Sequence, residues 1–305
     1  MNRRAFLAMG VGAAAAPWRA RAACGDFQLR FGVTQFDRFD PIAEIDRLDR
    51  WGFDYCEPSV ARVMALGDAD FEAARREAAR ARVHVEAMNS FIPADLKIVG
   101  PDVDRPRLDA YVAAALQRAE RLQAKIVVFG SGGARRVPDG FPPAEARRQL
   151  REFLRAVGGE IERRKYGMLI GIEALRKAES NIVNTSADAY RLAQETNHRR
   201  VRTIVDFFHL FVEGESPTVV RQIKDGLAHL HFSNPVQGRT FPRDVSECPG
   251  YAPFFANLRA IGYRGRMSLE ASSADFQSDL PAGLEVLRRL YSDACGGRSP
   301  VGPGL

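Results

Sequence analysis

The chain has 305 residues, of which 46% are hydrophobic and 27% are charged. This composition supplies a large core and is too balanced for a disordered chain or a coiled coil, while four cysteines and five histidines exclude a disulfide scaffold and a site built from many imidazoles. The formal net charge is +6, but four of these charges come from arginines in the first 22 residues, and no basic stripe with interleaved aromatic residues follows, so nucleic-acid binding is not expected.

The first expected element is an export signal over residues 1–22. Arg3 and Arg4 precede a short apolar run, and Ala20-Arg21-Ala22 is typical of a cleavage site. The run is too short to span a bilayer, and it resembles a twin-arginine (Tat) signal. That resemblance implies the twin-arginine export machinery as a partner, cleavage of the signal and a periplasmic location. A lipoprotein anchored at Cys24 and a frayed amphipathic start are the alternatives.

Short apolar runs then alternate with helical patterns along the chain. The expected strands are Phe27–Val33, Phe53–Glu57, Val83–Met88, Lys125–Gly130, Met168–Glu173, Val201–Asp206, Leu227–Phe232 and Arg266–Glu270. The expected helices are Pro41–Trp51, Ala69–Ala81, Arg107–Gln123, Ala144–Arg164, Ser186–Thr196, Pro217–Asp225, Ala252–Ile261 and Ala282–Tyr291. Most of these strands are near-continuous apolar runs, which is typical of a parallel sheet buried on both faces.

Eight strand–helix units predict a single-domain (β/α)8 TIM barrel over residues 23–295. The Gly/Pro-rich residues 296–305 are expected to form a flexible tail. An open doubly wound sheet is the structural alternative, but no Gly-x-Gly-x-x-Gly motif follows the first strand. No stretch within the expected barrel is long and apolar enough for a membrane span, and a homo-oligomer is left open.

Ionisable residues occur at the ends of four consecutive expected strands: Glu173, Asp206, His231 and Glu270. Catalytic residues of a barrel lie at the C-terminal ends of its strands, and neighbouring strands are about 4.8 Å apart. Three carboxylates would repel one another there unless a cation lay between them. The set therefore predicts one divalent metal ion, with Mn²⁺ favoured and Mg²⁺ or Co²⁺ as alternatives. Taken singly, a carboxylate after an apolar run is more often a helix cap.

His229 and His231 lie two residues apart and therefore point to the same face of one strand. His231 is nearer the expected catalytic mouth, so it is predicted to be the ligand, and His229 is predicted to be a deeper, hydrogen-bonded residue. The reverse assignment is left open.

Three further segments follow strand ends. Glu57 and Asn89 are candidate substrate contacts, with a buried structural carboxylate and a turn-forming asparagine as the alternatives. The segment GSGGARRVPDG lacks the Lys-Ser/Thr of a phosphate loop. It is interpreted as a flexible loop, with the anchoring of an anionic substrate by Arg135 and Arg136 as the alternative.

The second half of the chain resembles the sugar phosphate isomerase/epimerase family of xylose-isomerase-like barrels. The resemblance is carried by four motifs: GIEAL, VDFFH, HLHFSNP…GR…P and MSLEA. This family includes ketose 3-epimerases, hydroxypyruvate isomerases and inosose dehydratases. The resemblance implies a metal ion held by Glu173, Asp206, His231 and Glu270. It also implies substrate contacts by His209, from the Asp-x-x-His element, and by Arg239.

The chemistry implied by the resemblance is proton transfer next to the carbonyl of a keto sugar or related polyol. An enediolate stabilised by the metal ion would form, with Glu173 and Glu270 as the catalytic acid and base. A metal-dependent lyase or dehydratase acting on a keto sugar or cyclitol is the first alternative. A non-catalytic periplasmic carbohydrate-binding barrel is the second.

Cys24 and Cys295 lie near the two ends of the expected barrel domain. The chain enters a barrel at the bottom of its first strand, and its last helix returns towards that end. The two residues would then be close enough for a disulfide, which an oxidising compartment permits. Two unpaired surface thiols are the alternative.

Overall fold

The computed structural model describes residues 24–296 of the chain. The expected export signal, residues 1–22, and residues 297–305 of the expected tail lie outside the described residues. Within the described part, no helix is both long enough and apolar enough to pass through a membrane.

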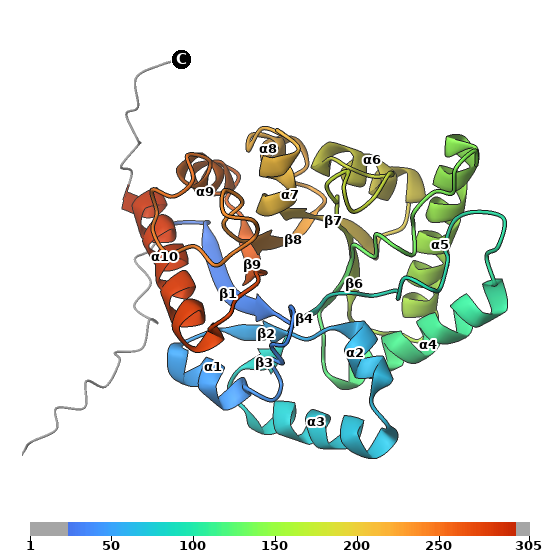
Figure 1. Ribbon diagram of the computed structural model, residues 1–305, viewed down its shortest axis with the longest axis horizontal. Helices are drawn as coiled ribbons and strands as arrows, with labels where there is room; N and C mark the ends of the chain where they lie inside the picture. Colours follow the sequence, from blue (N-terminus) through green and yellow to red (C-terminus); the bar gives the residue numbers. More distant parts are fainter. Residues whose placement is uncertain (1–23, 297–305) are drawn as a thin grey trace, which may run out of the picture.

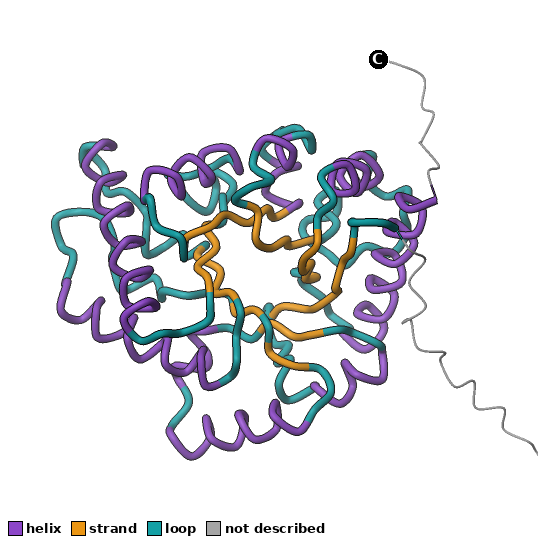
Figure 2. Tube along the Cα trace, turned by 180° about the vertical axis from the view of Figure 1, so that it is seen from behind, coloured by secondary structure: helices purple, strands orange, loops and turns teal. Residues whose placement is uncertain are grey.

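Nine strands of the described chain form one parallel sheet that curls into a nearly closed barrel, with helices around it (Figure 1 and Figure 2). The strands are β1 (Gln28–Thr34), β2 (Tyr55–Glu57), β3 (His84–Val85), β4 (Ala87–Met88), β5 (Ile126–Phe129), β6 (Leu169–Ile172), β7 (Val201–Asp206), β8 (Leu227–Phe232) and β9 (Arg264–Leu269). Their order is β3-β2-β1-β9-β8-β7-β6-β5-β4. The predicted TIM barrel is therefore confirmed.

The ring closes at the third expected strand, Val83–Met88, which the structure divides into β3 and β4 on either side of Glu86. The N–H of Glu86 donates to the carbonyl of Cys56 in β2. The carbonyl of Glu86 accepts from the N–H of Lys125, just before β5. One residue thus bridges the two ends of the sheet, and this accounts for nine short strands where the apolar pattern predicts eight.

The helices pack on the outside of the barrel, where Figure 2 shows them surrounding the strands. They are α1 (Ile45–Trp51), α2 (Val60–Ala65), α3 (Asp68–Arg80), α4 (Arg105–Arg121), α5 (Pro143–Arg163), α6 (Ser186–Thr196), α7 (Phe207–Val212), α8 (Val219–Gln222), α9 (Tyr251–Ala260) and α10 (Phe276–Gly296). The sequence pattern did not predict α2 and α7. Each has six residues, which is too short for a helical period to show.

Helix α10 begins earlier than expected, at Phe276, and carries Pro281 inside it. The side chain of Asp275 accepts hydrogen bonds from the N–H groups of Gln277 and Ser278, 3.1 and 3.3 Å away. These bonds satisfy backbone donors that the first turn of a helix leaves free. This cap explains why the helix starts before the proline, although the sequence predicted a start at Ala282.

Side chains alternate between the two faces of each strand, and this separates two apolar clusters. The cluster inside the barrel contains Tyr55, Ala87, Ile126, Val128 and Ile204. Residues next to them in the chain, such as Cys56, Val127 and Val205, belong to the larger core between the sheet and the helices. Every second residue beyond Tyr55 and Ile204 therefore also faces the interior, which places Glu57 and Asp206 there.

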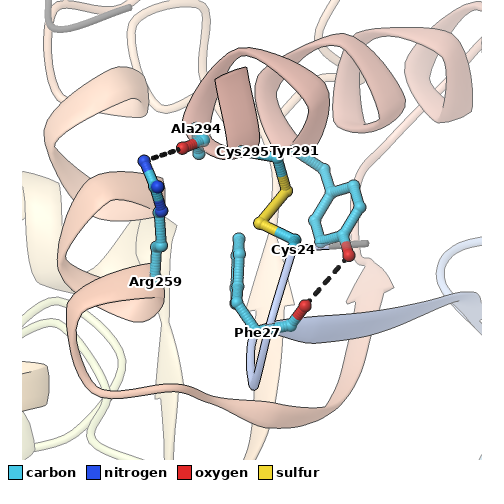
Figure 3. The surroundings of a disulfide bond; sticks show 6 residues. All are labelled: Cys24, Phe27, Arg259, Tyr291, Ala294 and Cys295. Carbon is cyan, nitrogen blue, oxygen red and sulfur yellow. Dashed lines mark hydrogen bonds between the residues drawn. A yellow bond between two sulfur atoms is a disulfide. The ribbon is translucent and has the colours of Figure 1, made fainter. Parts of the chain in front are cut away.

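A disulfide between Cys24 and Cys295 joins the segment before β1 to the end of α10, as the sequence allowed (Figure 3). The two Cα atoms are 5.3 Å apart, within the range for disulfides. Tyr291 of α10 adds a hydrogen bond from its hydroxyl to the carbonyl of Phe27, 3.0 Å away. Cys56 and Cys248 are buried and free.

Candidate metal centre and active site

The four ionisable residues at the expected strand ends converge in the structure. Glu173 follows β6, Asp206 ends β7, His231 lies in β8 and Glu270 follows β9, and these four strands are neighbours in the sheet. Asp206 and His231 are register partners. One oxygen or nitrogen atom from each side chain lies within 4.8 Å of the others, and all four residues are buried.

Two cationic groups lie among the three carboxylates. The Nδ1 atom of His231 is 2.9 Å from Oε2 of Glu270 and 3.1 Å from Oε1 of Glu173. The Nη2 atom of Arg239 is 2.6 Å from Oδ2 of Asp206 and also forms an ion pair with Glu270. The three carboxylates therefore require a neighbouring positive charge, which His231 and Arg239 supply.

The pKa values of the three carboxyls are shifted by burial and by these neighbouring charges. Burial, together with the charges of Glu270 and Asp206, raises the pKa of Glu173. Burial also raises the pKa of Asp206, against the opposing effect of Arg239. For Glu270 the charges of Arg239 and His231 outweigh burial and hold its pKa well below the usual range. Three buried carboxylates and one imidazole nitrogen are a donor set that fits a divalent ion such as Mn²⁺.

The two histidines of β8 occupy different levels of the barrel interior. His231 belongs to the cluster, whereas the Nε2 atom of His229 is 2.9 Å from Oε2 of Glu57. Glu57 is fully buried, and its other oxygen, Oε1, is 2.9 Å from Nε2 of His231. Burial would raise the pKa of Glu57, but the charges and hydrogen bonds of His231 and His229 outweigh it and lower the pKa to about 2. Glu57 thus lies beneath the cluster, as in the structural alternative that the sequence left open.

A cavity of about 350 Å³ opens above the cluster and is lined by Glu173 and Glu270. Asn89, His209 and Arg239 line it as well. Its volume is within the range of small-molecule sites. The structure therefore brings three of the four expected substrate contacts to the cavity, and Glu57 is the exception.

Asn89 and His209 are held by hydrogen bonds at the cavity wall. The Nδ2 atom of Asn89 donates to Oε1 of Glu270 over 3.2 Å, and its Oδ1 atom is buried without a partner among the described residues. Nδ1 of His209 accepts from the N–H of Arg176, and Nε2 of His209 is 3.6 Å from Oδ2 of Asp206. Burial lowers the pKa of His209 to about 4, so its imidazole is neutral near pH 7.

Sequence reasoning missed Glu179 and Phe36, which both line the cavity. Glu179 lines the cavity from the loop after β6, with Oε2 3.9 Å from Nε2 of His209. Glu179 lies six residues after Glu173, and the sequence does not show that the loop between them turns back to the cavity. Phe36 and Phe208 flank the guanidinium of Arg239, whose Cζ atom is 5.1 and 5.0 Å from the two ring centroids. These rings orient the arginine towards the carboxylates.

Arg135 does not have the anion-anchoring role that the sequence left open for it. It is fully buried, and its guanidinium donates to the carbonyls of Phe129 and Glu173 over 3.3 and 2.8 Å. The side chain therefore ties the ends of β5 and β6 together, and it cannot reach a substrate anion. Arg136, by contrast, is exposed.

Comparison with known proteins gives a family match over most of the chain. A family model described as xylose isomerase-like TIM barrel matches residues 45–290. An L-ribulose 3-epimerase of Methylomonas sp. (strain DH-1) is 28% identical over 131 residues, which are 42% of this chain and 44% of that protein. A D-psicose 3-epimerase of Enterocloster bolteae is 30% identical over 128 residues, which are 42% of this chain and 39% of that protein. The chain thus spans less than half of the length of these curated relatives in the matches.

Solved structures show the same fold over a longer span. The structure of an L-ribulose 3-epimerase superposes with a TM-score of 0.75 and 18% identity, and the match covers 90% of this chain and all of that chain. At this identity the likeness concerns the fold alone.

Proposed function

Because the chain belongs to the xylose isomerase-like TIM barrel family, we propose that it is a divalent-metal-dependent isomerase or epimerase of a keto sugar or related polyol. The observation that carries the proposal is the buried cluster of Glu173, Asp206, His231 and Glu270 beneath a cavity of small-molecule size. Curated relatives that are ketose 3-epimerases support the same reaction class.

The four cluster residues would hold the ion. Their oxygen and nitrogen donors suit Mn²⁺, with Mg²⁺ and Co²⁺ as alternatives. A divalent ion bound there would polarise the neighbouring carbonyl and hydroxyl oxygens of a keto sugar and so lower the cost of removing the proton between them.

Glu173 and Glu270 would move the proton. They come from β6 and β9, the outer two of the four neighbouring strands. Both glutamates line the cavity, so one carboxylate can take up the proton and the other can return it. Epimerisation would return the proton to the opposite face of the same carbon, and isomerisation to the neighbouring carbon.

Asn89, His209 and Arg239 would orient the sugar in the cavity. The unpartnered Oδ1 of Asn89 is free to accept a hydrogen bond from a hydroxyl group. Neutral His209 offers its Nε2 side, since Nδ1 is engaged by the backbone of Arg176. Arg239 supplies charge that a developing oxyanion would face. All three line the same cavity as the two glutamates.

We also propose that the chain is exported by the twin-arginine machinery and works in the periplasm. The disulfide between Cys24 and Cys295 supports this, because disulfides form and persist in oxidising compartments. Arg3 and Arg4 before a short apolar run support it independently. A route that carries folded proteins would also let the metal ion be loaded before export.

Hydrogen exchange tests the reaction class directly. We expect the Mn²⁺-loaded protein, incubated in D₂O with a panel of ketoses and keto-glycosides, to place deuterium on a carbon next to the carbonyl of one of them. NMR of the product then separates an inverted centre from a shifted carbonyl. Loss of water, seen by mass spectrometry, would assign a lyase instead. Binding without any exchange would leave only a carbohydrate-binding barrel.

A further inference from the structure

The carboxylate of Glu57 is enclosed by hydrogen-bonding side chains inside the barrel. Nε2 of His229 lies 2.9 Å from its Oε2, and Nε2 of His231 lies 2.9 Å from its Oε1. The hydroxyl of Ser268 donates to the same Oε2 over 2.6 Å. Each of these groups is fully buried, so water does not compete for the carboxylate. Glu57 thus makes three contacts from the one side chain.

These contacts fix the protonated nitrogen of both histidines. An ionised carboxylate accepts hydrogen bonds and donates none, so each imidazole must present an N–H at Nε2. The lone pair of a neutral imidazole then lies on Nδ1. For His229 that atom has no hydrogen-bond partner among the described residues, as expected for a bare acceptor in an apolar interior. Nδ1 of His231 lies 2.9 Å from Glu270 and 3.1 Å from Glu173, so it carries a proton when no ion is bound, and a bound metal ion would replace that proton.

We propose that Glu57 is a positioning residue of the metal centre, which holds His231 by its Nε2–H so that Nδ1 faces Glu173, Asp206 and Glu270 as a ligand. This inference rests on the proposed function, since it takes the cluster to be a metal site. A carboxylate behind a histidine ligand fixes the orientation of the ring and makes its free nitrogen a stronger donor.

The carboxylate is itself held from behind. The hydroxyl groups of Ser268 and Tyr55 are 2.7 Å apart and hydrogen-bonded. The ring of Tyr55 fits there because β1 has a glycine opposite, and a Cβ atom on Gly32 would lie 2.3 Å from that ring. A continuous series of buried hydrogen bonds therefore runs from Tyr55 through Ser268 and Glu57 to His231. It holds the Glu57 carboxylate where it can accept from the Nε2–H groups of both histidines.

The test replaces Glu57 with glutamine, which keeps the shape. A Glu57→Gln side chain can accept from one histidine N–H, but its amide N–H₂ group then faces the other. We expect the Mn²⁺ affinity of the metal-stripped protein, measured by calorimetry, to fall by about 10–100-fold. Circular dichroism and the Tm of the metal-free variant check that the barrel is folded.

Glu86→Gln is the matched control, because Glu86 is another buried glutamate that pairs with Arg30 and Arg266 and with no histidine of the cluster. We expect its Mn²⁺ affinity to stay within about threefold of the wild-type value, since the contacts of Glu57 with both histidines remain. A loss of affinity in the control as large as that in Glu57→Gln would overturn the proposal, because it would indicate a general effect on packing. Wild-type affinity in Glu57→Gln would also overturn it. A wild-type protein that binds no Mn²⁺ would refute the proposed function itself.

A second measurement is made on the wild-type chain, and a variant serves only to assign one signal. The sequence has five histidines, few enough for each ring to be followed by long-range ¹H–¹⁵N NMR of ¹⁵N-histidine-labelled protein loaded with diamagnetic Zn²⁺. His231 is assigned by the signals lost in His231→Asn. We expect Nε2 of His231 to carry the proton and Nδ1 to be the metal-bound nitrogen. The opposite arrangement would overturn the proposal.

Discussion

Glu173 and Glu270 differ in their surroundings although they share one cluster. The carbonyl of Glu173 is held by buried Arg135, while its carboxylate contacts His231. The carboxylate of Glu270 is bonded by Asn89 and also by Arg239. Both carboxylates contact His231, but that of Glu270 is also bonded by Asn89 and Arg239, so we expect the two glutamates to respond differently to substitution.

The residue-scale prediction concerns these two carboxyls. Glu173→Gln and Glu270→Gln should each lower turnover by at least about a hundredfold on a confirmed substrate, because an amide cannot take up or return the proton. Steady-state rates in both reaction directions are the measurement. An epimerase should show losses that differ with direction, since each glutamate serves one face of the carbon.

Glu152→Gln is the control for this prediction, because Glu152 is an exposed glutamate of α5. It should keep wild-type rates. If both active-site variants also kept them, proton transfer by these glutamates would be excluded.

At the scale of elements, the short loops after the strands shape the site. Gly130 directly follows β5, and a Cβ atom at this position would lie 2.3 Å from Oε2 of Glu173. The nearest atom belongs to the end of a side chain, so the carboxylate would be pushed aside while the backbone stays in place. The glycine therefore makes room for the carboxylate that follows the next strand.

We therefore expect Gly130→Ala to weaken Mn²⁺ binding and turnover by at least about tenfold, through displacement of one ligand, while the metal-free Tm changes little. Calorimetry and thermal melts measure the two effects. Gly159→Ala in α5 is the control, because a Cβ atom there meets nothing within 4 Å. Wild-type metal affinity in Gly130→Ala would show that Glu173 is not needed in its observed orientation.

The same elements show how much of this molecule can be predicted from its sequence. Apolar runs that end in Glu173, Asp206 and Glu270 predict both the strands and the cluster, because a parallel barrel forces consecutive strand ends together. The contact of Glu57 with His231 spans 174 positions, and no local pattern encodes which atoms meet across the interior. The burial of Arg135 was not predicted, because arginine is seldom fully buried.

At the scale of the whole molecule, chemistry and stabilisation lie at opposite ends of the barrel. The cluster occupies the C-terminal ends of the strands. Near the strand starts, Glu86 forms ion pairs with Arg30 of β1 and Arg266 of β9. The disulfide at Cys24 and Cys295 lies just before β1, so it ties the two ends of the described chain together away from the site.

This separation gives the last prediction, which concerns the disulfide. The bond closes a loop with a sequence separation of 271, and removing a disulfide of this kind costs about 2–4 kcal/mol, chiefly because the unfolded chain gains freedom. For a domain of this size we expect Cys24→Ser and Cys295→Ser each to lower the Tm by roughly 4–8 °C. Both should keep wild-type Mn²⁺ affinity, because the cluster proposed to bind the ion lies at the other end of the barrel.

Reductant supplies the internal control for the disulfide. Dithiothreitol should lower the Tm of the wild-type protein to that of the variants and leave the variants unchanged, since Cys56 and Cys248 are buried free thiols. Thiol titration of the unfolded, unreduced protein isolated from the periplasm should then find two free thiols out of four cysteines. Four free thiols there would contradict both the bond in the exported protein and the part of the export proposal that rests on it.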